Sequence, residues 1–260
     1  MISFPRIPGR GDFPGMKKLW REVFGDPDDF IDAFFDYWVT PELSLVTGEC
    51  ESAGFLLDFG TYLDKKCAMI YAVATAPEKR GLGFASTLVR ALSRRAAELG
   101  FDFTCLSPAS QSLFGYYETH TDQRTCFYCR RFDLAPCHSG LTAEFITPEE
   151  YYILREPLFG ALPHIKMNEK ALKWFELSGG RFLKISDRAC AAAEMQEGEL
   201  FIRELISPEQ SPREAAAAVL SIMGGSVCHV TAPDFDGERS IRHGTADISM
   251  PDAFLGLTFE

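Results

Sequence analysis

A buried strand that leads through a glycine-containing loop into an amphipathic helix is the strongest constraint on the fold of this 260-residue chain. Cys67–Ala74 is a continuous apolar run, which is typical of a strand buried on both faces of a sheet. Beyond Gly81 and Gly83, apolar residues recur at helical spacing from Ala85 to Leu99, with basic residues outside that stripe. This order predicts an α/β fold, in which helices and strands alternate around a mixed sheet.

Further periodic segments lie on both sides of this strand and helix. We expect helices at Trp20–Phe24, Phe30–Trp38, Ser110–Glu118 and Pro212–Met223. We expect strands at Leu43–Val46, Ala53–Phe59, Phe101–Leu106, Thr125–Phe132, Phe182–Ile185, Cys190–Met195, Glu199–Ile206 and Val227–Thr231. Aligning Pro77 with Pro208, an offset of 131 residues, matches strand, loop, helix and strand in the two halves. The chain is therefore expected to form two tandem lobes, residues 1–135 and 140–260, with the boundary in Arg131–Ser139.

The charge and hydropathy of the chain exclude several kinds of partner. A net charge of −11 and a pI near 5.0 argue against nucleic acid and against an anionic membrane surface. No apolar run approaches the roughly 20 residues of a membrane span, and the N-terminal residues lack a signal peptide's apolar stretch. We expect a cytoplasmic protein.

Eight cysteines raise the question of a metal site. Cys126 and Cys129, followed by Cys137-His138, have the spacing of metal ligands, but no second Cys-x-x-Cys pair accompanies them. Residues three apart on a strand also point to opposite faces. We therefore expect structural, reduced cysteines and no metal.

The start of the Ala85–Leu99 helix is suited to bind an anion. No Ser, Thr, Asp or Asn precedes Phe84 to cap its backbone N–H groups, and Gly81 and Gly83 leave the backbone accessible. Between Gly60 and Gly100, seven basic residues stand against three acidic ones, a local charge of +4. These features predict a pyrophosphate site.

The matching helix start in the second half has a different composition. Ser211-Pro212-Arg213-Glu214 has the sequence of a capping box with Pro at the first helical position. We expect these side chains to satisfy the helix donors and to repel phosphate, so the second half is not expected to bind the same ligand.

The residues of the first half resemble a known family. Arg80-Gly-Leu-Gly-Phe-Ala85 is similar to the Arg/Gln-x-x-Gly-x-Gly/Ala signature of GCN5-related N-acetyltransferases (GNAT), and Val73–Pro77 and Leu106–Glu118 extend the likeness over about residues 1–133. A Walker loop or a dinucleotide fingerprint fits less well, because no Lys-Ser/Thr follows the glycines and position 86 is Ser. A simple tight turn between strand and helix is the alternative without a ligand.

The resemblance implies an acyl-CoA N-acyltransferase fold and acetyl-CoA as co-substrate, with no metal. It implies that the loop residues Arg80, Gly81, Gly83 and Ala85 bind the CoA pyrophosphate, with Ser86 as a further donor. It also implies that Val73 and Thr75 bind the pantetheine arm, and that Tyr117 protonates the departing CoA sulfur. A phenol with a pKa near 10 suits a thiol leaving group. The alternative is that Tyr117 only packs in the core as an aromatic residue. Tyr116, the next residue before it, is expected to face another side of the helix.

The sequence does not identify the general base or the acceptor. Glu42, Glu49, Glu51 and Asp58 lie around the early strands, and His120 follows Tyr117. Leu255–Glu260 is a candidate last strand whose terminal carboxylate reaches the active site, a hypothesis that unchanged turnover after deletion of Glu260 would exclude.

The preferred interpretation is an N-acetyltransferase acting on a primary amine of a small molecule or a peptide. The second lobe then forms a degenerate copy that either lines the acceptor cleft or forms a homodimer surface. The alternatives are a non-catalytic acyl-CoA-binding regulatory module on the same fold and a structural protein without a ligand.

Overall fold

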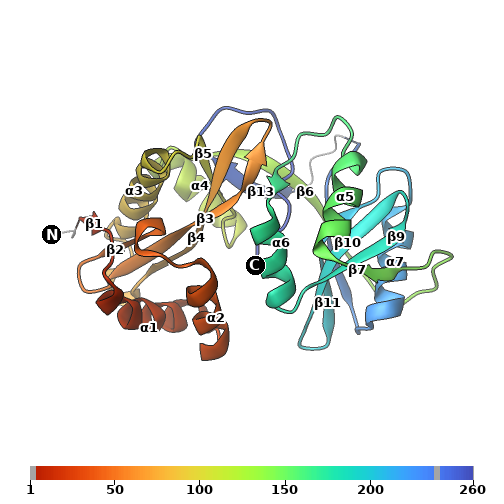
Figure 1. The fold of residues 1–260 in the computed structure, drawn as a ribbon, viewed down its shortest axis with the longest axis horizontal. Helices are drawn as coiled ribbons and strands as arrows, with labels where there is room; N and C mark the ends of the chain where they lie inside the picture. The colour runs from red at the N-terminus through yellow and green to blue at the C-terminus, as the bar shows by residue number, and fades with distance from the viewer. Residues whose placement is uncertain (1–3, 237–240, 260) are drawn as a thin grey trace. The chain divides into compact units, whose positions relative to one another are not determined.

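A computed structural model describes residues 4–236 and 241–259 (Figure 1). The chain divides into two compact units, each described by itself below. The first unit comprises Met1–Thr125 and Thr245–Ser249, and the second unit comprises Cys126–Gly244 and Met250–Glu260. Within the described residues, no helix is both long enough and apolar enough to cross a membrane.

The first unit is a mixed sheet with helices on both faces. Its helices are α1 (Phe13–Phe24), α2 (Asp28–Trp38), α3 (Phe84–Glu98) and α4 (Gln111–His120), with short 3₁₀ turns at Arg10–Asp12, Pro41–Leu43 and Pro77–Lys79. Its strands are β1 (Pro5–Arg6), β2 (Ser44–Thr47), β3 (Ser52–Tyr62), β4 (Lys65–Thr75) and β5 (Phe103–Leu106). They lie in the order β1-β2-β3-β4-β5, and the end of β13 (Ile241–Ala246) pairs with β5.

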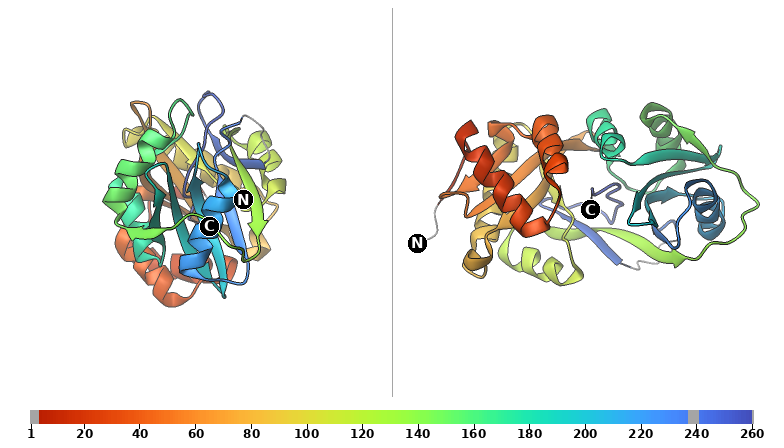
Figure 2. Two further views of the ribbon diagram at one scale, coloured as in Figure 1. Left: turned by 90° about the vertical axis from the view of Figure 1, so that its right-hand side faces the viewer. Right: turned by 90° about the horizontal axis from the view of Figure 1, so that it is seen from below.

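The two faces of this sheet have different cores. Trp20 of α1 and Phe34 of α2 pack on Phe55 of β3, with ring centroids 5.5 and 5.6 Å from it. Leu56, the next residue of β3, points to the opposite face and packs with Leu88 of α3. Helices α1 and α2 therefore cover one face and α3 the other, as the two views of Figure 2 show.

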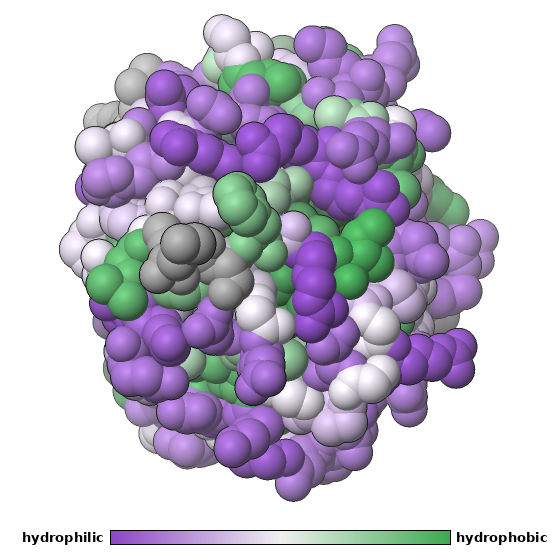
Figure 3. Space-filling view, turned by 90° about the vertical axis from the view of Figure 1, so that its left-hand side faces the viewer, coloured by the Kyte–Doolittle hydropathy of each residue, from purple (hydrophilic) through white to green (hydrophobic). Residues whose placement is uncertain are grey.

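The exterior of this unit is polar over the face drawn in Figure 3. Hydrophilic residues cover most of that face, and the hydrophobic patches between them are small and separated.

Strands β4 and β5 are parallel neighbours over a short length only. Their last registered pair is Met69 with Cys105, so the rest of β4 extends beyond its parallel partner. Opposite β3, the register shifts between Tyr71 and Ala74, and Ala72 has a positive φ of 48°. This bulge kinks β4 just before the strand ends, which re-aims its backbone and side chains.

The second unit repeats the order of strands, helix and strand on a sheet of its own. Its strands are β6 (Arg124–Leu134), β7 (Glu144–Ile146), β8 (Lys166–Met167), β9 (Arg181–Ser186), β10 (Ala189–Gln196), β11 (Glu199–Ile206) and β12 (Cys228–Ala232). Its helices are α5 (Pro148–Leu158), α6 (Glu169–Leu177) and α7 (Pro212–Met223). The sheet order is β6-β12-β11-β10-β9-β7, and α7 packs on an apolar core from β9, β10, β11 and β12.

Strands β11 and β12 also separate after a short parallel ladder. Their last registered pair is Ile202 with Val230. On the neighbouring strand β10, the adjacent residues Ala193 and Ala192 pair with Ile202 and Glu204 of β11. Arg203 lies between those two residues of β11 and is therefore the extra residue of a bulge. Each unit thus has a bulged strand before its main helix, and the tandem-copy origin of this likeness stays a prediction.

Most of the expected elements form, and two details differ. The segment Arg131–Ser139 begins inside β6, which runs on to Leu134, so the expected boundary falls partly within a strand. Residues 255–259 form no strand, although Ala253 and Phe254 make isolated bridges with Phe127 and His164. Glu260 lies outside the described residues.

The expected capping box at the start of α7 is wrong. Ser211 is the N-cap residue, but its side chain accepts no hydrogen bond from the helix. The helix start is instead covered by a neighbouring segment, because Ser139 Oγ donates to Glu214 O at 3.0 Å. A Cβ added to Gly140 would meet Glu214 Oε1 at 3.1 Å, so this segment leaves little room for a ligand at the helix end.

Candidate active site

The loop between β4 and α3 holds two glycines in a conformation that other residues rarely adopt. Gly81 has φ 76° and Gly83 has φ 84°. Gly83 is the N-cap residue of α3, and no side chain caps the helix. The left-handed backbone explains why glycine stands at these two positions, since a Cβ there costs about 1–2 kcal/mol.

The backbone amides of this loop form an open set of donors. Within the part of the chain that the structure describes, no hydrogen-bond acceptor lies on the amides of Leu82, Gly83, Phe84 or Ala85. Leu82 is exposed, so the loop is accessible to a solute. Consecutive N–H groups at a helix start, together with the helix dipole, favour an anion at this position.

The sequence predicted that Ser86 adds a further hydrogen-bond donor for the pyrophosphate, but its donors have other partners in the structure. Its amide donates to the hydroxyl of Tyr116 at 3.1 Å, and its own hydroxyl donates to Gly83 O at 3.1 Å. Both donors of Ser86 therefore have protein partners. Tyr116 comes from α4 and was expected to face away, so its presence at the start of α3 is a feature that helical periodicity alone did not indicate.

The two basic residues before the glycines have different surroundings. Lys79 forms an ion pair with Glu51, with Nζ and Oε1 3.0 Å apart. Arg80 is exposed and its Nε lies 3.4 Å from Thr75 O. Arg80 is thus the better placed of the two to neutralise an anion at the loop, whereas the charge of Lys79 is already balanced.

The end of β4 presents main-chain groups on the side where β5 has diverged. Val73 is half-buried against the core beside α3. Thr75 pairs with Ser52 across β3, and their hydroxyls lie 3.1 Å apart. The side chain of Thr75 is therefore used within the sheet, and its main chain is the part that remains to bind a ligand.

Tyr117 lies where α4 meets the core formed by α3 and β4. It packs against the same cluster as Val73 and Leu88. Burial raises the pKa of Tyr117 to about 12, and the neighbouring Tyr116 adds to this rise. The phenol of Tyr117 consequently stays protonated at physiological pH, as a proton donor requires.

The candidate general bases have no feature in common that marks one of them for the role. Glu42, Glu49 and Asp58 are exposed, and Glu51 is paired with Lys79. The His120 ring lies 5.0 Å from that of Tyr116, at the exposed end of α4. Sequence reasoning left the base unassigned, and the structure singles out none of these five residues.

A polar cluster that sequence reasoning missed anchors β5 from a distant part of the chain. Asp247 accepts hydrogen bonds from the amide and the hydroxyl of Thr104, at 2.7 and 2.6 Å. Gln123 donates to the same hydroxyl at 2.9 Å. A separation of 143 residues between Thr104 and Asp247 gives no local pattern that a single sequence reveals.

The structure offers no metal centre among the residues it describes. No group of three or more His, Cys, Asp or Glu side chains is arranged to hold an ion. Cys126 and Cys129, the pair with metal-ligand spacing, are both buried within β6.

Comparison with known proteins agrees with the class of fold that these features define, an acyltransferase-type mixed α/β sheet. Residues 5–119 match the family model described as acetyltransferase (GNAT) domain. This region contains β4, the loop and Tyr117, so the part of the chain that resembles a GNAT acetyltransferase domain is the part that holds the candidate site. No significant match was found among curated proteins.

Solved structures extend the likeness over most of the chain. A GCN5-related N-acetyltransferase from Kribbella flavida is 16% identical, with a TM-score of 0.65 over 93% of this chain and 70% of its own. One from Anabaena variabilis is 13% identical, with a TM-score of 0.64 over 93% and 71%. One from Sphaerobacter thermophilus is 15% identical, with a TM-score of 0.52 over 94% and 93%. At these identities the likeness concerns the fold.

Proposed function

We propose that the protein transfers an acetyl group from acetyl-CoA to a primary amine. The observation that carries this proposal is the set of partnerless amides at Leu82–Ala85, which lies beside the diverging ends of β4 and β5. A pyrophosphate on these amides would allow a pantetheine chain to run along the exposed main chain of β4 toward Val73.

The chain's own residues have distinct roles in this reaction. The loop amides and Arg80 bind the phosphates, and the main chain of Val73 and Thr75 orients the pantetheine arm. As the amine nitrogen bonds to the acetyl carbon, the carbon–sulfur bond breaks and Tyr117 gives its proton to the departing sulfur. The amine loses its own proton to a base that is not assigned.

The acceptor is proposed by class only. An amine is cationic in water, and the net charge of −11 favours its approach to the protein. A small-molecule amine or a peptide amine both fit this argument, and we propose an intracellular setting in which acetyl-CoA is available.

Calorimetric titration with acetyl-CoA, followed by an amine panel monitored through free thiol, tests the proposal. We expect binding of acetyl-CoA and amine-dependent release of CoA. Binding without thiol release for any amine supports the rival function, a non-catalytic acyl-CoA-binding module. Absence of acetyl-CoA binding overturns both functions.

A further inference from the structure

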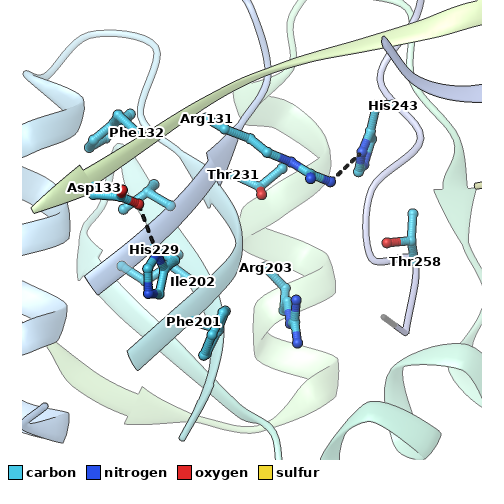
Figure 4. Close-up of a pocket in the computed structure, with 11 residues that line it drawn as sticks. Arg131, Phe132, Asp133, Phe201, Ile202, Arg203, His229, Thr231, His243 and Thr258 are labelled. Atoms are coloured by element: carbon cyan, nitrogen blue, oxygen red, sulfur yellow. Dashed lines mark hydrogen bonds and ion pairs between the residues drawn. The ribbon is translucent and has the colours of Figure 1, made fainter. Parts of the chain in front are cut away.

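Two concave regions of the second unit differ in how their charges are balanced. The first, a cavity of about 220 Å³, lies on the face of the sheet where β6, β12 and β11 are neighbours (Figure 4). Cationic side chains around it have acidic partners, because Arg203 pairs with Glu194 and His229 lies between Asp133 and Glu199. The charges around this cavity thus largely cancel.

The second region is a groove of about 460 Å³ between α5 and β7, the last strand of the sheet. Its apolar wall comes from both elements and consists of Ile146, Ile153, Leu154, Pro157 and Leu158. Ile153 is 65% exposed, so an apolar solute can reach this wall from the solvent. Sites for small molecules are typically hollows of about 300–1,000 Å³ with mostly apolar walls, and the groove falls within this range.

The wall also contains a main-chain acceptor, because α5 has a proline inside it. Pro157 has no N–H group and cannot donate to the carbonyl of Ile153, which lies one helical turn before it. Both residues line the groove. The missing helical bond leaves acceptor capacity, and therefore partial negative charge, at the apolar wall.

The rim of the groove has a surplus of negative charge. Its charged residues are three acids, Glu144, Glu150 and Asp187, and one base, Lys184, which leaves a net charge of −2. Lys184 Nζ pairs with Asp187 Oδ1 at 2.6 Å, and Glu144 lies opposite Lys184 in the strand register. Among the described residues, Glu144 itself forms no ion pair within 4.0 Å.

The charge of Glu150 is not cancelled by the groups that bind it. Its Oε2 accepts hydrogen bonds from the amide and the hydroxyl of Thr147, at 2.8 and 3.0 Å. Both donors are neutral, and they lower the pKa of Glu150, with the amide as the larger cause. The carboxylate is therefore ionised at physiological pH and held at the start of α5, beside the groove.

We propose that this groove binds an organic cation with an apolar body. The side chains of Ile146, Ile153 and Leu154 contact the body, and the carboxylates of Glu144 and Glu150 attract the positive charge. Charge complementarity favours this occupant, because a rim charge of −2 on a chain of net charge −11 disfavours an anion of the same shape. The site lies within the second unit and does not depend on the acetyl transfer proposed above.

NMR titration of the full chain with octyltrimethylammonium and, separately, with octanoate tests this proposal. The two probes have the same apolar chain and opposite charges. A quaternary ammonium has no proton to exchange for an acetyl group, so turnover in the first unit does not enter the measurement. We expect the cation to bind, and octanoate to bind about fivefold more weakly or less tightly still.

Two substitutions locate the binding and separate its apolar part from its charged part. Ile153→Ser should weaken binding of the cation about fivefold or more, because the apolar contact is lost. Its matched control is Ile222→Ser, since Ile222 is also an exposed isoleucine of a helix but lies outside the groove. Glu144→Gln should weaken binding about threefold, whereas Glu197→Gln, an exposed carboxylate between β10 and β11, should not change it.

Thermal unfolding of each variant shows whether it remains folded. Equal affinities for the two probes, or no binding of the cation, overturn the proposal. An affinity of Ile153→Ser equal to that of the parent chain, or to that of Ile222→Ser, also overturns it, because binding would then lie outside the groove.

Discussion

The two units place a bulged strand before a helix, but they offer different donors at that point. In the first unit, β4 leads through Gly81 and Gly83 to a helix whose amides lack acceptors. In the second unit, β11 leads to α7, whose start has Pro212 and is covered by the segment around Gly140. The first unit thus presents open main-chain donors at the start of its helix, whereas the corresponding helix start in the second unit is covered.

The interiors of the two units also differ, because one is apolar and the other contains a buried ion pair. The aromatic core around Trp20 and Phe55 in the first unit is apolar. The second unit buries Arg155 and Glu204 completely, with Arg155 Nε and Nη2 at 2.6 and 3.0 Å from the two carboxylate oxygens. Tyr151 donates to the same carboxylate. The first unit therefore combines an apolar core with an open glycine loop, whereas the second unit has a buried ion pair in its interior.

The largest expected effect is on the stability of the second unit. Glu204→Gln removes the fully buried one of the two carboxylates that pair with Arg155, the other being Glu156, and should reduce the free energy of unfolding by about 3–5 kcal/mol. Chemical denaturation measures this loss. Glu209→Gln, which breaks an exposed pair with Arg188, should change the stability by no more than about 1 kcal/mol. Equal losses of unfolding free energy in the two variants would show that the buried ion pair stabilises the fold no more than the exposed one.

The next effect concerns catalysis in the first unit. Tyr117→Phe removes the proposed proton donor and should lower kcat about 100-fold or more, while the dissociation constant of acetyl-CoA stays unchanged. Because burial raises the pKa of Tyr117 to about 12, the phenol should cause no decline of kcat up to pH 10. Steady-state kinetics across pH measure both expectations. An unchanged kcat in Tyr117→Phe would exclude Tyr117 as the proton donor and would mean that it only packs in the core.

Sequence patterns identified the elements of both units because those patterns are local. The strand Cys67–Ala74 was recognised from its continuous apolar run and the helix Pro212–Met223 from its periodicity, and the helix was placed with the observed bounds. The glycine loop was likewise a local signal, and the structure gives Gly81 and Gly83 the backbone that only glycine adopts easily.

The features that were missed depend on contacts between distant residues. The Ser211 capping box has the right sequence, but the helix start is instead covered by Ser139 and Gly140. The hydrogen bond from Ser86 to Tyr116 joins residues 30 positions apart. The bulge that places Arg203 results from the register of β10 and β11, which no single-strand pattern specifies.

A smaller effect tests whether the first unit binds through its loop backbone. Gly83→Ala and Gly100→Ala both place a Cβ on a left-handed residue, with φ 84° and 85°, at opposite ends of α3. Each should lose about 1–2 kcal/mol of stability from the same strain. Only Gly83→Ala should also weaken acetyl-CoA binding, about tenfold, because its Cβ stands where the anion approaches the amides.

Denaturation and calorimetry of the two glycine variants separate strain from binding. Equal affinities of Gly83→Ala and Gly100→Ala for acetyl-CoA would mean that the amides at the start of α3 do not bind the cofactor. The proposed difference between the two helix starts would then be wrong.

The smallest expected effect is a pH-dependent contribution of His229 in the second unit. Hydrogen bonds to Asp133 and then Glu199 raise its pKa above the ordinary histidine value of about 6.5. A raised pKa in the folded state means that the stabilisation is fully present below about pH 6.5 and is lost as pH rises through the folded-state value. His229→Gln should therefore lower Tm at pH 5.5 and have no effect at pH 9. His138→Gln, an exposed histidine, should leave Tm unchanged at both pH values. A Tm difference for His229→Gln that persists at pH 9 would assign its contribution to stacking on Phe201, 4.7 Å away, and not to its charge.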